Sequence, residues 1–211
     1  MFAFALLLAV PLIDARWAVL LACPRVSTPG NTDGTGVVIG VKDGFAYLLT
    51  ASHVAPFERV EVAFATRESY PKPAWYGDGA EVVARWPDPD LALVRFPLGK
   101  RSVSVLPLAP PWQRPKAFPV SAVSVGTGDP APRTETIRAK EFVTREGKQA
   151  AFFWRTNDPP ESGRSGGPLL DGRGRAIGIA VAASGGKGYF AHHDEILAAL
   201  KRDGFGWLVP W

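Results

Sequence analysis

A serine at position 165 stands between glycines in the stretch Gly163-Arg-Ser-Gly-Gly-Pro168, which follows a flexible turn and precedes a short apolar run. Glycine adopts backbone conformations that other residues avoid, so this stretch can fold tightly and present the Ser165 hydroxyl beside free backbone N–H groups. Such an arrangement suits a nucleophile with an oxyanion hole next to it. The same composition is also typical of an ordinary surface loop between two strands.

Two upstream stretches supply the groups that a serine nucleophile needs. His53 ends the apolar run 47–52, and Asp90 opens the alternating run 91–96. A hydroxyl is a poor nucleophile at neutral pH, so it requires a base to take its proton and a carboxylate to orient that base. Histidine is the natural base, and the chain has only three histidines. A histidine placed directly after a strand therefore favours catalysis.

Taken together, the motifs Thr50-Ala-Ser-His53, Asp90-Leu-Ala-Leu93 and Gly163-x-Ser-Gly-Gly-Pro168 resemble those of the trypsin-like (chymotrypsin-fold) serine proteases, in the same order. The resemblance is closest to the bacterial HtrA/Deg-type protease domain and extends from residue 34 to about residue 200. It implies a serine endopeptidase that cuts polypeptides through an acyl-enzyme intermediate and needs no cofactor.

The resemblance also implies a role for each matching residue. Ser165 would be the nucleophile, His53 the general acid and base, and Asp90 the carboxylate that orients the imidazole. The backbone N–H groups of Gly163 and Ser165 would form the oxyanion hole. Asp88 is a rival carboxylate, but only Asp90 directly precedes Leu-Ala-Leu.

The chain departs from the digestive branch of this family at two positions. Arg164 stands directly before the serine, where those enzymes carry the aspartate that pairs with a new N-terminus after zymogen cleavage. We therefore expect a single-chain enzyme whose oxyanion loop is ordered by other contacts. Pro159 stands where trypsin has the negative base of its specificity pocket, which argues against a preference for arginine or lysine.

The segment expected to wall the substrate pocket consists of Val181, Ala182 and Ala183, which are small and apolar. Together with Pro159, it predicts a preference for small to medium hydrophobic side chains at the scissile bond. Lys187 would change this preference if its ammonium group turned inward, although an exposed lysine is the more common arrangement in a glycine-rich turn.

Two other functions fit parts of the sequence. The stretch 163–167 also satisfies G-x-S-x-G, the nucleophile elbow of α/β-hydrolases, and Asp171 and His192 follow in the order of those enzymes. That fold needs parallel strands alternating with long helices, and only one convincing helix is predicted here. The second alternative is a binding or chaperone-like domain on the protease fold, with a silent or partner-gated site. Arg164 beside the oxyanion loop motivates it.

Short strands separated by turn residues predict an all-β fold. The expected strands are 35–41, 45–50, 60–65, 80–86 and 91–96 in the first half, and 117–125, 134–144, 150–156, 168–170, 176–183 and 188–192 in the second. Strands at this spacing favour β-barrels. The family resemblance implies two antiparallel six-stranded barrels with a short C-terminal helix and the active site in the cleft between the barrels.

The proline-rich stretch 106–115 is expected to link the two barrels. We divide the chain into an N-terminal segment over residues 1–33, a first barrel over 34–108, and a second barrel with the terminal helix over 109–211. The helix is predicted over 195–202, with Asp194 as its N-cap and Gly204 at its end.

Composition excludes several other classes of protein. A hydrophobic content of 46% with 22 glycines and 20 prolines indicates a turn-rich globular chain. The single cysteine, Cys23, excludes an internal disulfide and a cysteine-based zinc site. His192 and His193 are adjacent, and neighbours on a strand point to opposite faces, so we expect no metal. The net charge of +4 comes from scattered lysine and arginine residues, so no nucleic-acid partner is expected.

The apolar run Phe2–Ile13 is too short to span a bilayer but suits the core of a signal peptide, although no positive residue precedes it. Leu20-Leu-Ala-Cys23 also resembles a bacterial lipobox, with Asp14 and Arg16 interrupting the apolar core. We expect an exported protein, in the cell envelope or secreted, with membrane attachment or an apolar element packed on the domain as alternatives to cleavage. The sequence after Ser165 is too short for the PDZ domain that HtrA proteins carry, so none is expected.

Overall fold

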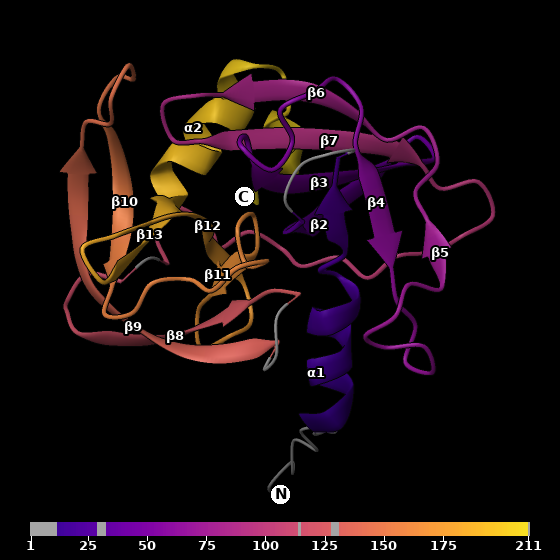
Figure 1. Cartoon of the computed structure of the whole chain (residues 1–211), viewed down its shortest axis with the longest axis horizontal. Helices are drawn as coiled ribbons and strands as arrows, with labels where there is room; N and C mark the ends of the chain where they lie inside the picture. Colours follow the sequence, from indigo (N-terminus) through magenta and orange to yellow (C-terminus); the bar gives the residue numbers. More distant parts are fainter. Residues whose placement is uncertain (1–11, 29–32, 114, 128–130, 211) are drawn as a thin grey trace, which may run out of the picture.

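The computed structural model describes residues 12–28, 33–113, 115–127 and 131–210, and consists mainly of β-strands (Figure 1). The signal-like run Phe2–Ile13 lies outside these residues except at its last two positions. The helices are α1 (Leu12–Leu21), α2 (His193–Arg202) and the 3₁₀ helix η1 (Gly206–Leu208). The strands are β1 (Arg25–Ser27), β2 (Gly34–Lys42), β3 (Phe45–Ala51), β4 (Glu61–Phe64), β5 (Trp75–Tyr76), β6 (Glu81–Trp86), β7 (Leu91–Pro97), β8 (Val120–Val125), β9 (Pro132–Val143), β10 (Ala151–Thr156), β11 (Pro168–Leu170), β12 (Ala176–Ser184) and β13 (Lys187–His192).

The first half of the chain forms one antiparallel sheet of seven strands in the order β5-β4-β1-β2-β3-β7-β6. The sheet curls, because a bridge between Arg59 and Glu81 brings β6 back beside the start of β4. The predicted hairpin between β2 and β3 turns at Asp43 and Gly44, which have φ angles of 51° and 77°. Positive φ at both central residues is what a tight hairpin turn of this kind requires.

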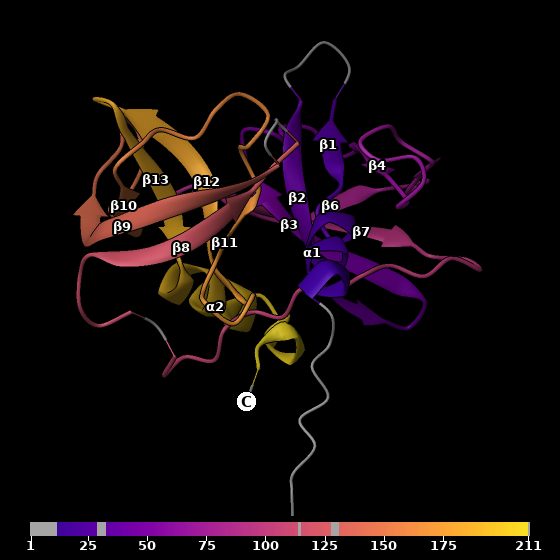
Figure 2. The ribbon, with the colours of Figure 1, turned by 90° about the horizontal axis from the view of Figure 1, so that it is seen from below.

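The second half forms a closed antiparallel barrel in the order β10-β13-β12-β11-β8-β9. The two halves lie side by side and are joined by the segment 98–119 (Figure 2). The prediction of an all-β, two-barrel chymotrypsin-like fold is thus confirmed. The structure differs from this prediction in the first half, where the sheet is curled rather than closed. Its extra strands β1 and β5 are only three and two residues long, too short to produce an alternating pattern.

The N-terminal segment packs on the first half. β1 lies between β2 and β4, with Val26 fully buried. The Trp17 ring of α1 meets the Tyr70 ring edge to face, with centroids 5.6 Å apart. The apolar residues of α1 do not gather on one stripe, so a helical period could not be read from the sequence. Within the described ranges, no helix is long and apolar enough to cross a membrane.

The C-terminal helix α2 begins at His193, two residues earlier than predicted with an N-cap at Asp194. His192 is the N-cap, and its ring Nδ1 accepts the backbone N–H of Asp194 at 2.9 Å. The prediction of Asp194 as N-cap is therefore wrong. His192 has the extended backbone of an N-cap residue, and its ring accepts the hydrogen bond that caps the helix. Asp194 lies in the first turn instead, where its carboxylate accepts Lys140 Nζ at 2.8 Å.

The chain after α2 returns to the first half. Trp86 Nε1 of β6 donates to Asp203 Oδ2 at 2.6 Å, and the Trp207 ring of η1 lies 4.9 Å from the Tyr47 ring of β3. The tail of the second half thus contacts the edge strand β6 and the inner strand β3 of the first half. These contacts help to fix how the two halves sit against each other.

Candidate active site

The pairing of β3 with β7 brings His53 and Asp90 together. Ala51 of β3 is opposite Leu91 of β7, so the residues that follow one strand and precede the other meet at the same end of the pair. Asp90 Oδ2 lies 2.8 Å from His53 Nδ1, and Asp90 Oδ1 accepts the backbone N–H of His53 at 3.1 Å. The carboxylate therefore contacts both the ring and the backbone of the histidine.

Asp90 is 8% exposed and has a φ of 59°, in the left-handed region that non-glycine residues rarely adopt. Its carbonyl accepts the N–H of Ser52 at 3.0 Å. Arg145 reaches across from the second half and donates Nη1–H to Asp90 Oδ2 at 3.2 Å. The rival carboxylate, Asp88, instead accepts the backbone N–H of Gln149 at 2.9 Å. Arg145 carries no sequence signal, since an arginine in a charged, glycine-containing turn is typical of a solvated hairpin.

Ser165 lies on a turn that packs against the end of β3. Its carbonyl accepts the N–H of Thr35 at 2.8 Å. Gly166 has a φ of 85°, and a Cβ at this position would overlap the Thr35 carbonyl oxygen and the Thr50 hydroxyl. Only glycine allows this close approach, which places the turn next to the strand that leads into His53. Within the described ranges, the Ser165 hydroxyl makes no hydrogen bond.

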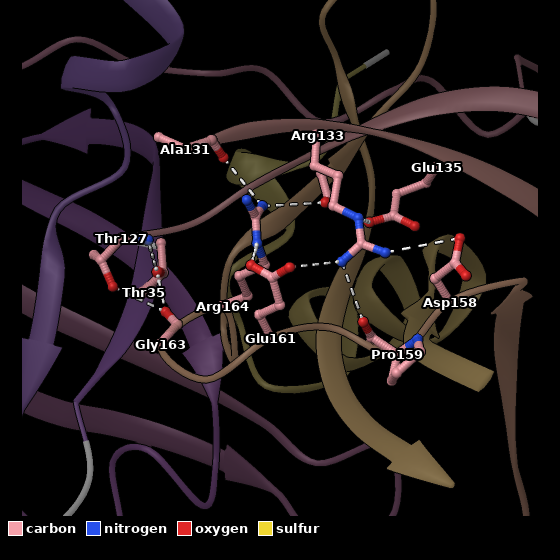
Figure 3. A network of polar contacts seen from close by, with 11 residues as sticks. Thr35, Thr127, Ala131, Arg133, Glu135, Asp158, Pro159, Glu161, Gly163 and Arg164 are labelled. Atoms are coloured by element: carbon pink, nitrogen blue, oxygen red, sulfur yellow. Dashed lines mark hydrogen bonds and ion pairs between the residues drawn. The ribbon is translucent and has the colours of Figure 1, made fainter. Parts of the chain in front are cut away.

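The loop before Ser165 is fixed by its carbonyl groups. The Gly163 carbonyl accepts the hydroxyls of Thr35 and Thr127 at 2.6 and 3.0 Å, one from each half of the chain (Figure 3). The carbonyl of Arg164 accepts a backbone N–H at 2.9 Å. As far as the described residues go, the backbone N–H groups of Gly163 and Ser165 donate to no protein acceptor. These are the two groups predicted to form an oxyanion hole.

Arg164 is buried in the second barrel, with 1% of its side chain exposed (Figure 3). Its Nη1 donates to the Ala131 carbonyl at 3.0 Å and lies 3.4 Å from the Ser124 hydroxyl, while Nε lies 3.8 Å from a Glu161 oxygen. Burial lowers the pKa of Arg164, and attraction by Glu161 opposes that effect. The sequence predicts that contacts other than an N-terminal ion pair order this loop. The hydrogen bonds of the buried Arg164 side chain are such contacts.

A second arginine, Arg133 of β9, ties the same loop to the barrel (Figure 3). Its guanidinium lies 3.7 Å from Asp158, 3.4 Å from Glu161 and 3.7 Å from the buried Glu135. Glu135 accepts the hydroxyl of Ser124 at 2.7 Å. Burial raises the pKa of Glu135, although this hydroxyl and the charge of Arg133 partly oppose the shift. Charged groups of the second half therefore hold the loop before Ser165 against the barrel.

Two hollows lie beside Arg145, and the first of them also contains the His53–Asp90 pair. One, of about 440 Å³, is lined by Ser52, His53, Pro56, Arg85, Pro87, Asp90, Arg145 and Lys148. The other, of about 320 Å³, is largely apolar and is lined by Val143, Thr144, Arg145, Glu146, Phe153, Ala182, Ser184 and Tyr189. Arg145 is the residue that lines both hollows.

The residues predicted to wall the substrate pocket belong to β12 and to the loop before Ser165. Along β12, Val181 is buried, Ala182 is half-buried and Ala183 is exposed, and Ala182 lines the apolar hollow. Pro159 is exposed, with its carbonyl 3.4 Å from Arg133 Nη1. Lys187 is exposed at the start of β13.

The residues of the α/β-hydrolase alternative have other partners. Asp171 accepts Arg175 Nε at 3.0 Å in the turn between β11 and β12. His192 is fully buried, with its ring 3.9 Å from that of Trp154, and His193 is buried with Nε2 at the Ala109 carbonyl. No cluster of histidine, cysteine and acidic residues in the described ranges could hold a metal ion.

Known proteins share this architecture. Residues 34–179 match the family model described as a trypsin-like peptidase domain. The inactive form of Rv3671c from M. tuberculosis H37Rv, solved as a serine-to-alanine mutant, has a TM-score of 0.71 at 21% identity, with 90% of each chain covered. The active form of the Rv3671c protease from M. tuberculosis has a TM-score of 0.68 at 20% identity, with 90% of this chain and 84% of that chain covered. A search of curated protein sequences finds no match.

Proposed function

Because the chain belongs to the family of trypsin-like peptidase domains, we propose that it is a serine endopeptidase acting through His53, Asp90 and Ser165. One observation carries the proposal. The carboxylate of Asp90 lies 2.8 Å from the inner nitrogen of His53. A buried carboxylate in this position fixes the tautomer of the imidazole and leaves its outer nitrogen to act as a base.

The chemistry follows from these positions. Ser165 Oγ attacks the carbonyl carbon of the scissile bond while His53 Nε2 takes the hydroxyl proton, and the N–H groups of Gly163 and Ser165 stabilise the oxyanion. Collapse of this intermediate breaks the C–N bond, and the leaving amine takes the proton from His53. Water then attacks the acyl-enzyme ester with His53 again as the base, which releases the acid and restores the serine. Catalytic hydrogen bonds in such sites often tighten only when substrate is bound, which is consistent with an unbonded Ser165 hydroxyl.

The proposed substrate is an exposed or unfolded polypeptide with small to medium hydrophobic side chains at the cleavage site. Three features support this choice: the small apolar residues Val181 and Ala182 on β12, the neutral Pro159 in the loop before Ser165, and the apolar hollow lined by Phe153 and Ala182. An apolar wall gains from burying hydrophobic side chains and offers no counter-charge to a lysine or arginine.

A small fluorophosphonate tests the nucleophile, because it reacts only with a serine that is activated beside a formed oxyanion hole. Labelling of the parent protein and none of Ser165→Ala is the expected result. Without labelling of the parent, the proposal fails in favour of a silent or partner-gated polypeptide-binding domain. In that case, peptide binding would be unaffected by Ser165→Ala.

A further inference from the structure

Arg145 links the second half of the chain to the His53–Asp90 pair in the first half. It lies in the hairpin between β9 and β10, at the edge of the second barrel, yet its guanidinium reaches the turn before β7 in the first half. Its side chain is 27% exposed and that of Asp90 is 12% exposed, so a partly exposed cation contacts a buried carboxylate.

The guanidinium donates three hydrogen bonds to the turn before β7. Nη1 donates to Asp90 Oδ2 at 3.2 Å, and Nη2 donates to the carbonyls of Pro87 and Asp88 at 3.0 and 2.8 Å. The same hairpin adds a fourth contact, from the backbone N–H of Gln149 to Asp88 Oδ1 at 2.9 Å. A planar guanidinium that binds the carboxylate and two preceding carbonyls fixes their relative positions, which a flexible ammonium cannot do.

Arg145 and His53 share one oxygen of Asp90. Oδ2 receives both the Arg145 Nη1–H and the His53 ring, while Oδ1 receives the His53 backbone N–H. The Asp90 carboxylate therefore accepts hydrogen bonds on each oxygen, and the contacts of Arg145 surround a residue whose backbone φ of 59° is strained. A cation beside the carboxylate also weakens its attraction for a protonated imidazole, so the contribution of Arg145 lies in orientation rather than in charge.

We propose that Arg145 is a positioning residue, which sets the orientation of Asp90 and through it of His53, and couples this pair to the docking of the second barrel. The inference rests on the proposed serine endopeptidase function. It assigns the hairpin over residues 144–150 a part in catalysis, although none of the motifs points to it.

Lys148 supplies a matched control. It lies in the same hairpin, carries the same charge and lines one of the hollows that Arg145 lines, but its ammonium group makes no hydrogen bond or ion pair with any described residue. Removing Arg145 should open a gap between the two hollows that a guanidinium ion can enter from solvent.

The experiment measures the second-order rate at which a small fluorophosphonate labels Ser165 in the parent, Arg145→Ala, Arg145→Lys and Lys148→Ala. Because the reagent does not occupy the apolar hollow, its rate reports on the triad rather than on substrate binding. We expect Arg145→Ala to react about 10- to 100-fold more slowly, as loss of a charge-assisted hydrogen bond to a buried group would produce. Arg145→Lys should lie between this variant and the parent, and Lys148→Ala should equal the parent.

Added guanidinium at low millimolar concentration should restore part of the rate of Arg145→Ala and leave Lys148→Ala unchanged. The inference is overturned if Arg145→Ala reacts at the rate of Lys148→Ala. It is also overturned if Arg145→Ala reacts slowly, guanidinium does not raise its rate, and Arg145→Lys reacts equally slowly. Should Arg145→Ala fail to fold, a rate for Arg145→Lys equal to that of the parent would contradict the inference. An unlabelled parent would instead contradict the proposed function itself.

Discussion

Two arginines of the second half hold the loop of Ser165 and the His53–Asp90 pair in different ways. Arg164, with 1% of its side chain exposed, stays within its own barrel and anchors the loop of Ser165. Arg145, with 27% exposed, crosses to the other half and anchors Asp90. A buried group leaves unpaired partners when it is removed, whereas a partly exposed ion pair contributes little to stability. We therefore expect Arg164, at the Ser165 loop, to matter mainly for folding. We expect Arg145, at the His53–Asp90 pair, to matter mainly for activity.

The largest expected effect separates these two roles directly. Arg164→Ala should lower the free energy of unfolding by about 3 kcal/mol or more, since it leaves a cavity and removes the buried hydrogen bonds to the Ala131 carbonyl and the Ser124 hydroxyl. Arg145→Ala should lower it by about 1 kcal/mol or less. Denaturant unfolding of both variants measures the difference. Equal losses would remove the distinction between a structural and a positioning arginine.

The next effect tests the hydroxyl contacts of the serine side. Thr35→Val removes the hydroxyl that donates to the Gly163 carbonyl and accepts the N–H of Thr127. We expect kcat to fall about tenfold, because the peptide group beside the oxyanion hole loses a buried anchor.

Thr50→Val is the matched control. The Thr50 hydroxyl is buried in the same contact between the halves, but it donates to the Thr35 carbonyl at 2.7 Å and not to Gly163. Both variants should lose about 1 kcal/mol of stability, while only Thr35→Val should lose activity beyond the control. Peptide hydrolysis by the two folded variants decides the point, and equal kcat values would exclude a special role for Thr35.

The smallest expected effect concerns pH. The pKa of Glu135 is raised on folding from the ordinary value of 4.5, mainly by burial, so the folded chain holds this proton more tightly than the unfolded chain. Its contribution to stability is complete below the unfolded pKa and is lost as the pH rises through the folded pKa. From about pH 4 upward, the parent should therefore lose stability relative to Glu135→Gln. Thermal unfolding across this range measures the difference, and parallel curves would contradict a raised pKa.

Much of the fold could be predicted because its strands are local patterns. The runs that became β3 and β7 are apolar and bounded by turn residues, and the hairpin at Asp43 and Gly44 has the composition that its positive φ angles require. β1 could not be predicted, because a three-residue strand has no period and forms only by pairing with β2 and β4.

The site divides in the same way. The pairing of His53 with Asp90 could be predicted because short motifs precede and follow them, and the structure places His53 Nδ1 2.8 Å from Asp90 Oδ2. Arg145 could not, since its contact with Asp90 spans 55 residues and depends on how the two halves dock. Arg164 stood out in the sequence as a departure, but only the folded barrel shows that its charge is buried rather than directed at the cleft.

The most direct test of the proposed activity is mass spectrometry of an unfolded polypeptide after incubation with the parent, Asp90→Asn and Ser165→Ala. The parent should produce discrete fragments cut beside hydrophobic residues. Asp90→Asn should produce them about 10⁴-fold more slowly, since the asparagine favours the wrong imidazole tautomer, and Ser165→Ala should produce none above background. Fragments formed by Ser165→Ala at the rate of the parent would show that Ser165 is not the nucleophile and would contradict the assigned mechanism.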